Sequence, residues 1–471
     1  MSIDERPAPG PTTVTTDAVA ALRAALLGTV LVPGDAGYDN ARRVWNGLID
    51  RHPAVIVRCS GMADVVEAVA FARHHPVPVS IRGGGHQVAG SAVCDDGIVI
   101  DLSTMNGVLV DPVARTARVQ AGARWADVDR ATQLFGLATT GGEVSITGVA
   151  GLTLGGGMGL TQRAFGLACD NLRSIEIVTA DGVVRTASPD QHPDLFWAAK
   201  GGGRGLGVVT AFEFALHPLG PDVTAAMVAY ADDEATAVVR AWHDLALDAP
   251  DVISPELNLW TVPPDPALPA ELHGRPIVLV AALFAGDPAD ADATLRPYRE
   301  LAEPLLDMTE TMPYAVLQSA FDAVVPDGNR YYFKSHFTDE LTDDAIDALI
   351  AVGRARPNPD SLVVVRTMGG AISRVSADDS AYPHRGARFN ISLDGLWSDP
   401  ADDAAVVGWS RQSWDRLRPF ANGGVYVNFA GFEGEADVSP AATFGSNVER
   451  LDAVRADYDP DGLFTGAAAR P

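Results

Sequence analysis

The chain has 471 residues, of which 47% are hydrophobic and 20% are charged, and its formal net charge is −26 at pH 7. This length predicts two lobes that share a large buried core. The acidic excess disfavours nucleic acid and anionic membrane as partners, because both would be repelled. No stretch is long and apolar enough for a transmembrane helix, and residues 1–14 lack the apolar segment of a secretory signal, so we expect a disordered tail and a cytoplasmic protein.

Strands and helices alternate in the first half of the chain. An apolar run over 54–57, a helix over 62–74 and a strand over 79–81 predict a strand–helix–strand unit of an α/β layer. A strand over 97–102 follows, and we expect 116–120 to be its partner in the sheet. The remaining elements of this half are a helix over 123–134 that ends at Gly136, a hairpin of 174–179 and 183–187 turned at Asp181-Gly182, a helix over 193–200 and a strand over 208–216.

The texture of the sequence changes after residue 220, where longer strand-like runs replace glycine-rich loops. These runs and the helices between them predict a second, α+β lobe with a mostly antiparallel sheet. The expected strands cover 257–260, 277–284, 330–337, 362–368 and 387–393, and the expected helices cover 234–247 and 342–354. A last helix over 446–458 is expected to pack back on the first lobe.

Three glycine-rich segments carry the main functional signal. Glycines 83–85 directly follow a strand and precede His86, and two further segments cover 141–159 and 201–205. A run of glycine N–H groups can approach a ligand closely and form a nest for an anion such as pyrophosphate. The second segment has neither the GxGxxG spacing of a Rossmann fingerprint nor the Lys and Ser/Thr of a P-loop, which disfavours a Rossmann dehydrogenase and a nucleotide hydrolase. Together the segments predict a long ligand in a groove lined by backbone, with the neutral imidazole of His86 as a competent nucleophile beside it.

Several separated motifs, in the same order, resemble the berberine-bridge-enzyme-like FAD-linked oxidases of the vanillyl-alcohol-oxidase superfamily, which share a PCMH-type FAD-binding domain. The motifs are Arg82-Gly83-Gly84-Gly85-His86-Gln87-Val88-Ala89-Gly90, residues 97–106, 155–159, 166–171 and 194–198, and the closing segments Tyr426-Val427-Asn428-Phe429 and Tyr458-Asp459-Pro460. The resemblance covers nearly the whole chain. It is strongest to bacterial 6-hydroxynicotine oxidases and to the Favorskii-type flavin oxygenase of the enterocin pathway.

This resemblance implies a two-lobed α+β fold of the covalent-flavin oxidase type, in which both ends of the chain form the FAD lobe. It divides the chain into a FAD-binding domain over 15–220, an inserted substrate-binding domain with an antiparallel sheet over 221–424, and a closing berberine-bridge-type segment over 425–471. It also implies FAD joined to His86 through an 8α-histidyl bond. Some family members have a second bond through a cysteine just ahead of the glycine run over 155–159, where this chain reads Ser145-Ile146-Thr147-Gly148, so we expect a single attachment.

The implied activity is oxidation of a small organic substrate, an alcohol, an amine or a polyketide-type intermediate, by hydride transfer to flavin N5. Molecular oxygen then accepts the electrons and gives H2O2. Two alternatives stay open: a flavin N5-oxide oxygenase of a natural-product pathway, and a non-catalytic small-molecule-binding protein on the same fold. We expect a monomer or a homodimer.

Residues expected to bind the cofactor come from the glycine-rich segments and from positions that the family motif marks. They are Arg82, Gly83, Gly84, Gly85, His86, Gln87, Gly90, Ser91, Gly142, Ser145, Gly148, Gly151, Leu152, Gly155, Gly156, Gly157, Asn171, Ile177, Val178 and Asn428. The expected substrate and catalytic residues are Tyr332, Lys334, Arg366, Tyr426 and Asn428, with Tyr426 a candidate base. Alternation along the strand puts Tyr332, Lys334 and His336 on one face, and either face could line the substrate pocket.

The chain departs from the family pattern at Gly205-Leu206 and over 462–467. Both regions normally lie near the flavin or close its lobe, so the departures bear on substrate positioning more than on flavin binding. Cys59, Cys94 and Cys169 have no zinc-ligand spacing, so we expect no metal. We expect Cys169 to be a structural thiol.

Overall fold

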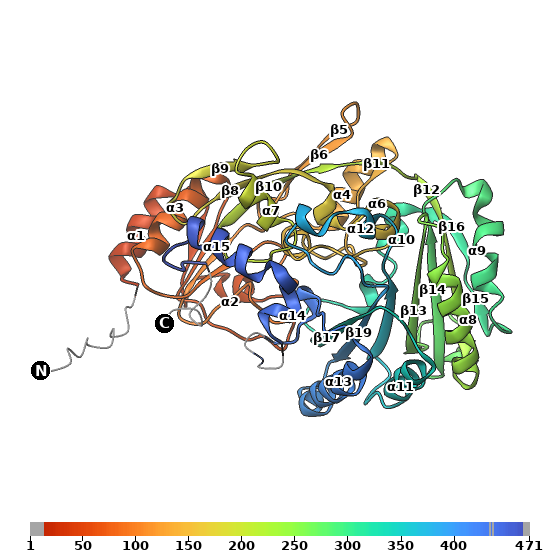
Figure 1. Ribbon diagram of the computed structural model, residues 1–471. Coiled ribbons are helices and arrows are strands. Elements are labelled where there is room, and N and C mark those ends of the chain that lie inside the picture. Colours follow the sequence, from red (N-terminus) through yellow and green to blue (C-terminus); the bar gives the residue numbers. More distant parts are fainter. Residues whose placement is uncertain (1–13, 433–434, 436–437, 465–471) are drawn as a thin grey trace, which may run out of the picture.

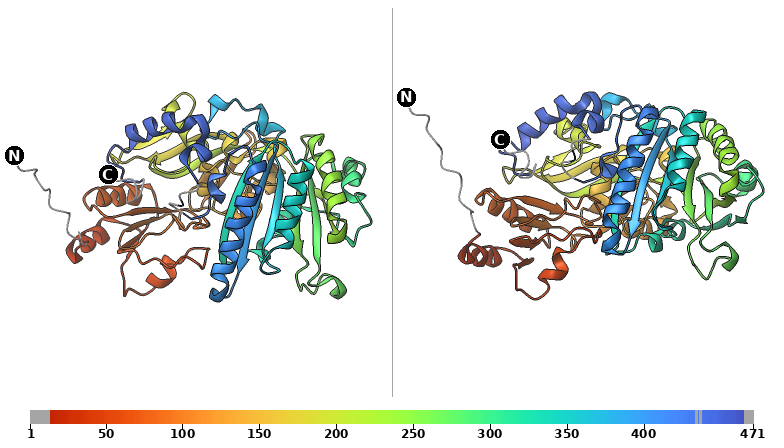
Figure 2. Two further views of the ribbon diagram at one scale, coloured as in Figure 1. Left: turned by 60° about the horizontal axis from the view of Figure 1, so that its bottom comes forward. Right: turned by 90° about the horizontal axis from the view of Figure 1, so that it is seen from below.

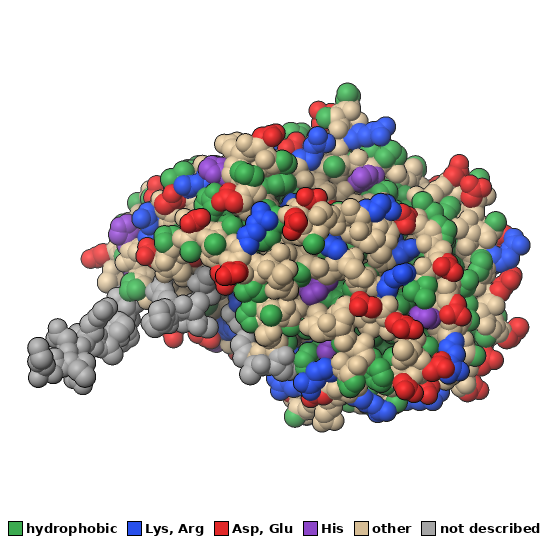
Figure 3. Space-filling model, viewed as in Figure 1, with side chains coloured by type: hydrophobic (Ala, Val, Ile, Leu, Met, Phe, Trp, Pro, Cys, Tyr) green, Lys and Arg blue, Asp and Glu red, His purple; other side chains and the backbone are tan. Residues whose placement is uncertain are grey.

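The computed structural model describes residues 14–432, 435 and 438–464 and forms two lobes (Figure 1). Residues 1–13 of the expected tail over 1–14 lie outside the described residues, as do the altered residues 465–467. The first part of the chain and its last helices occupy one lobe, and the middle of the chain forms the other. Acidic and basic side chains are intermixed over the face shown in Figure 3. Within the described part of the chain, no helix combines the length and the apolar character needed to cross a bilayer.

A four-stranded sheet opens the first lobe. Its strands, in order of pairing, are β1 (Thr29–Leu31), β2 (Val55–Arg58), β4 (Ile98–Asp101) and β3 (Val79–Arg82). Both β2 and β3 run parallel to β4, and α3 (Met62–Arg73) connects them. This arrangement confirms the strand–helix–strand unit predicted from the sequence. The helices before β2 are α1 (Thr16–Ala25) and α2 (Tyr38–Arg42).

A five-stranded antiparallel sheet completes the first lobe. Its strands, in order of pairing, are β5 (Val108–Asp111), β6 (Thr116–Gln120), β10 (Val208–Ala215), β8 (Leu172–Val178) and β9 (Val184–Ala187). Residues 116–120 therefore pair with β5 and β10, and the expectation that they pair with the strand over 97–102 is wrong. The nearer partner β5 is an edge strand with alternate residues exposed, so its apolar signal is weak. The other elements are α4 (Trp125–Thr132), β7 (Leu137–Ala138), α5 (Val149–Leu154), α6 (Gln162–Phe165), α7 (Pro193–Ala199) and β11 (His217–Pro218).

The second lobe is built on one large antiparallel sheet. Its strands, in order of pairing, are β15 (Leu306–Asp307), β12 (Asp222–Ala231), β14 (Pro276–Phe284), β13 (Ile253–Thr261), β18 (Leu362–Thr367), β19 (Phe389–Trp397) and β17 (Arg330–Thr338), and β16 (Glu310–Pro313) pairs with β12. Helices pack on one face of this sheet and bury it in the core of the lobe (Figure 2). These helices are α8 (Ala235–Leu247), α9 (Ala291–Arg299), α11 (Asp343–Arg354) and α13 (Asp403–Leu417), and the short helices α10 (Tyr314–Gln318) and α12 (Ala371–Arg374) lie outside this layer. The opposite face of the sheet lines the space between the two lobes.

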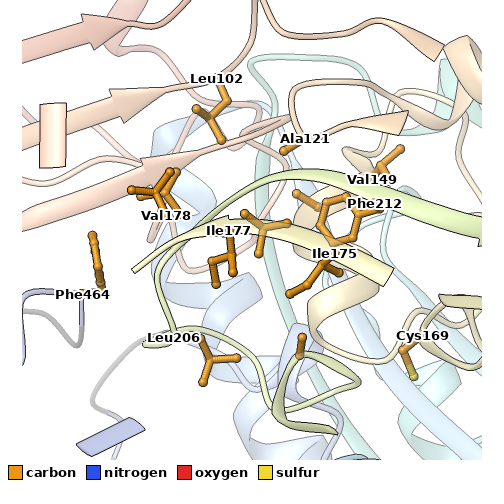
Figure 4. Packing of buried hydrophobic residues seen from close by; sticks show 14 of the residues in the cluster. Leu102, Ala121, Val149, Cys169, Ile175, Ile177, Val178, Leu206, Phe212 and Phe464 are labelled. Carbon is orange, nitrogen blue, oxygen red and sulfur yellow. The ribbon is translucent and has the colours of Figure 1, made fainter. Parts of the chain in front are cut away.

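The two ends of the chain share one hydrophobic core. The last helices are α14 (Pro440–Phe444) and α15 (Val448–Tyr458). Side chains of α15 and Phe464 are buried in the same cluster as Phe212 of β10 (Figure 4). The Arg455 guanidinium of α15 also donates to the carbonyl of Gly202 at 2.8 Å. The last helix therefore packs on the first lobe as predicted, and the architecture is the expected two-lobed α+β fold.

Candidate active site

A cavity of about 820 Å³ lies between the two lobes. Its first-lobe wall draws residues from 83–89, 142–155 and 203–207, so the three glycine-rich segments line one space. Its second-lobe wall is formed by alternate side chains of β13, β18 and β19, with contributions from β14 and β17. One ligand lying in this space would therefore touch both lobes.

Direct backbone contact between the first two glycine segments shapes the first-lobe wall. A Cβ atom on Gly84 would lie 2.4 Å from the Cα atom of Gly148, and one on Gly148 would lie 2.6 Å from that of Gly84. A side chain at either position would therefore push the two loops apart. Further along the same wall, Gly151 has no atom within 4 Å of the place where a side chain would begin. Its missing side chain leaves the cavity open.

His86 stands on the cavity wall, where stacking holds its ring. The ring centroid lies 4.0 Å from that of Trp45, and Trp45 stacks in turn on Tyr331 of the second lobe at 3.7 Å. Burial, assisted by the Arg124 guanidinium, lowers the pKa of His86 to about 3. The imidazole is therefore neutral near pH 7, and one of its nitrogens has a lone pair available for nucleophilic attack.

Tyr426 and Asn428 reach the cavity from the segment that follows α13. The Tyr426 hydroxyl accepts hydrogen bonds from the backbone N–H groups of Gly157 at 3.2 Å and Met158 at 3.3 Å, and from Asn428 Nδ2 at 2.9 Å. Burial raises the pKa of Tyr426 to about 12, so its hydroxyl stays protonated at neutral pH. These contacts give Tyr426 a positioning role, because it holds the second glycine run against the closing segment.

The second-lobe wall carries a cluster of charged side chains. Arg366 lies here, and its Nε and Nη2 atoms donate to the two carboxylate oxygens of Glu143 at 2.6 and 2.7 Å. Glu256 and Asp394 line the cavity in the same cluster. Burial raises the pKa of Glu256 to about 8 and that of Asp394 to about 6, against the opposing effect of Arg366.

Sequence reasoning missed most of this cluster, including Glu143, Glu256, Asn258 and Asp394. Two signals were present. Glu256, Asn258 and Trp260 alternate along β13 and so share one face, which lines the cavity. Asp394 is the one charged residue of the buried strand Phe389–Trp397. A buried acid inside a strand indicates a specific partner or a function, because charged residues are rarely buried unpaired.

The structure places Tyr332 and Lys334 outside the cavity lining. They project from the face of β17 that packs against α13, where Lys334 Nζ lies 4.3 Å from the Trp414 ring centroid and donates to Glu435 at 3.1 Å. The other face of the strand, which carries Phe333, lines the cavity. The expected substrate contact of Tyr332 and Lys334 is thus corrected: the wall uses the alternate residues of this strand. The predicted residues that do line the cavity are Gly83, Gly84, Gly85, His86, Gln87, Ser91, Gly142, Gly148, Gly151, Leu152, Gly155, Arg366, Tyr426 and Asn428.

The other expected cofactor residues lie behind this lining. They are Arg82, Gly90, Ser145, Gly156, Gly157, Asn171, Ile177 and Val178. Ser145 Oγ donates to Asp322 at 2.6 Å, and Asn171 Nδ2 donates to the carbonyl of Leu167 at 2.9 Å, so both side chains support neighbouring loops. Cys169 is buried, and this burial raises the pKa of its thiol, as fits a structural role.

Comparisons with known proteins agree with the class that this fold and site define, a two-lobed flavoenzyme. Residues 53–188 match the family described as FAD binding domain, and residues 425–468 match the family described as berberine and berberine like. The chain is 31% identical over 448 residues to the FAD-linked oxidoreductase YgaK of Bacillus subtilis (strain 168), which covers 93% of this chain and 96% of that relative.

Solved structures share the fold over nearly the whole chain. BBE-like 1 of Physcomitrella patens matches with a TM-score of 0.85 at 24% identity, over 95% of this chain and 97% of that one. The 6-hydroxy-D-nicotine oxidase of Arthrobacter nicotinovorans matches with a TM-score of 0.81 at 25% identity, over 93% of this chain and 96% of that one. The chain belongs to the berberine-bridge-enzyme-like family of FAD-linked oxidoreductases.

The cavity lining fits FAD. The bare backbone at Gly84, Gly148 and Gly151 leaves room for a long ligand to lie against N–H groups, as a pyrophosphate requires. Gln87 lines the cavity, and its side-chain oxygen is buried without a hydrogen-bond partner among the described residues, so a bound group can supply one. The volume of about 820 Å³ lies within the range of cofactor sites, roughly 300–1,000 Å³.

Proposed function

We propose that the protein is an oxidase that carries FAD through a single 8α-histidyl bond at His86 and oxidises a small organic molecule. The observation that carries the proposal is the position of His86: a neutral imidazole, stacked on Trp45, on the wall of a cavity lined by three glycine-rich segments. The stretch over 145–148, ahead of the glycine run over 155–159, holds no cysteine, which supports a single bond.

FAD held by His86 and the glycine-rich segments would supply a hydride acceptor that O2 can reoxidise, with H2O2 as the product. The chain itself must orient the substrate, exclude water and accept the proton that the substrate loses. Asp394 is our candidate for the proton acceptor, because it lines the cavity and burial brings its pKa to about 6, near the working pH. Arg366 holds Glu143 of the first-lobe wall through two hydrogen bonds, so its role is positioning.

The absorption spectrum before and after acid precipitation tests the attachment. Flavin colour that stays with the precipitated protein, and that moves to the supernatant in His86→Ala, is the expected result. His273→Ala is the matched control, because His273 lies outside the cavity lining. Colour that leaves the wild-type pellet would remove the covalent bond from the proposal, and protein without flavin would overturn the proposal as a whole.

A second measurement separates oxidase from oxygenase chemistry. With labelled oxygen and a substrate that turns over, we expect stoichiometric H2O2 and no 18O in the organic product. Incorporation of 18O would contradict the oxidase and favour the N5-oxide oxygenase.

A further inference from the structure

One guanidinium of the second-lobe wall faces three carboxylates: Glu143 on the first-lobe wall, and Glu256 and Asp394 on its own wall. Arg366 is engaged by Glu143 through two hydrogen bonds and by Ser392 Oγ through a third at 2.8 Å, and its Nε lies 3.7 Å from Glu256. The pair of Arg366 and Glu143 cancels in charge, so Glu256 and Asp394 remain without a cation of their own in this cluster. An anionic substrate would have to displace Glu143 and also approach two further acids.

Asp394 supplies an independent sign that something binds here. Its side chain lines the cavity, the residue is only 6% exposed, and its Oδ1 atom has no hydrogen-bond partner among the described residues. A buried carboxylate oxygen without a donor is unfavourable, because the loss of its hydration is not compensated. A donor that arrives from the cavity would remove this cost.

The protonation of the cluster indicates which kind of donor fits. Burial, the Glu143 charge and the incomplete compensation by Arg366 raise the pKa of Glu256 to about 8 and hold that of Asp394 at about 6. Near neutral pH the cluster therefore keeps a proton that an isolated pair of carboxyl groups would lose. A bound cation can replace that proton, whereas a neutral hydroxyl group can only share it.

The rest of this wall fits the body of such a ligand. Around the cluster the lining is apolar and aromatic, and it includes Trp260, Leu279, Phe333, Val364, Leu396 and Phe429. Aromatic faces next to carboxylates suit an organic cation, because the rings attract positive charge as well as apolar surface. A strongly hydrated metal ion gains nothing from such walls.

We propose that the cluster of Glu143, Glu256 and Asp394 is the binding site for a protonated amine, so that the substrate is an organic amine with an apolar body. This inference rests on the proposed function for the oxidation, but the binding site itself does not depend on turnover. Asp394 would accept a hydrogen bond from the ammonium group, Glu256 would face it with a second carboxylate, and Arg366 would keep Glu143 in place.

The test compares three probes that differ only at one end: 4-phenylbutylamine, 4-phenylbutan-1-ol and 4-phenylbutanoate. Binding to the purified holoenzyme is followed by the change in melting temperature and by calorimetry. We expect the amine to bind at least tenfold more tightly than the alcohol, and the carboxylate to bind most weakly. Equal binding of the three probes, tighter binding of the alcohol or the carboxylate, or no binding of the amine would overturn the inference.

Variants refine this test. Asp394→Asn and Glu256→Gln should each weaken amine binding about tenfold and leave alcohol binding within twofold. Asp244→Asn is the matched control, because it makes the same charge change on a side chain that is 83% exposed. Unchanged amine affinity in both cavity variants would overturn the inference; should they fail to fold, the comparison of probes on the wild type decides alone.

The same samples separate the two proposals. Colourless protein that still prefers the amine would overturn the oxidase and leave the amine site standing. Yellow protein that shows no preference for the amine would overturn the amine site and leave the oxidase standing.

Discussion

The two walls of the cavity are built by different means. The first-lobe wall is largely backbone, since Gly84 and Gly148 touch and Gly151 presents no side chain. The second-lobe wall consists of side chains at alternate positions of one sheet, such as Glu256 and Asp394. A wall of touching backbones tolerates few substitutions, whereas side chains on a sheet face can change while the strands stay in place. The backbone wall therefore suits a ligand that stays the same, and the side-chain wall can be adapted to a ligand that varies.

The largest expected effect follows from a substitution in the side-chain wall. Arg366→Met removes the cation between Glu143 and Glu256 and leaves buried carboxylates uncompensated. We expect the free energy of unfolding to fall by about 3 kcal/mol, as for other buried pairs that lose one partner. Urea unfolding measures this loss. The exposed pair of Arg240 and Asp343 provides the control, because Arg240→Met should cost no more than about 0.5 kcal/mol. Equal losses in the two variants would contradict the prediction.

The next largest effect follows from a substitution in the backbone wall. Gly84→Ala places a methyl group 2.4 Å from the Cα atom of Gly148. We expect a loss of roughly 2 kcal/mol in unfolding free energy, together with a lower flavin content. Gly151→Ala is the matched control, because its methyl group meets no protein atom within 4 Å. Its apoprotein should keep wild-type stability, and a large loss there would mean that the two glycines do not differ in the way described.

A smaller effect lies where the backbone wall meets the closing segment. Tyr426→Phe removes the hydroxyl that accepts from Gly157 and Met158, and the two N–H groups lose a buried acceptor. Both hydrogen bonds are long, so we expect a loss of about 1 kcal/mol. Tyr458→Phe is the control, since that hydroxyl is only partly buried and water can replace its partners. A Tyr426→Phe protein with full stability and an unchanged flavin spectrum would show that this hydroxyl does not stabilise the second glycine run against the closing segment.

The pH dependence of stability reports on the buried carboxyl groups of the side-chain wall. The pKa of Glu256 is raised in the folded protein to about 8, from 4.5, by burial and by Glu143, and Arg366 opposes this. The folded state therefore binds more protons than the unfolded state between these values, so this group makes the protein less stable as pH rises from 4.5 towards 8. The slope is at most about 1.4 kcal/mol per pH unit. Urea unfolding between pH 5 and 8 should show a shallower decline in Glu256→Gln than in the exposed-site control Glu271→Gln, and parallel declines would contradict the assignment.

The backbone wall was the part of the site that could be predicted from the sequence. A glycine run after a strand is a local signal, and Gly83, Gly84, Gly85 and His86 line the cavity as expected. The second lobe was also predictable at the level of its strands, because β13, β14, β17, β18 and β19 have apolar runs of strand length.

The side-chain wall was not predictable in the same way. Arg366 and Glu143 are 223 positions apart in the chain, so no local sequence pattern predicts their ion pair. Both faces of β17 carry aromatic residues, Tyr331 and Phe333 on one and Tyr332 on the other, and only the packing of α13 decides which face meets the cavity. Ile177 was expected to bind the cofactor, whereas it lies in the hydrophobic core of the first lobe and outside the cavity lining.

The contact of α15 with α7 has a consequence for how the protein is made. About 250 residues separate the two helices, and a ribosome that adds about 5–20 residues per second needs roughly 10–50 s to synthesise them. Until then the apolar surface that α15 and Phe464 cover has no partner. The core of the first lobe therefore stays incomplete while the second lobe is synthesised. A prematurely terminated chain lacks the residues that complete this core. The buried core of the first lobe is therefore completed only after the second lobe has been synthesised.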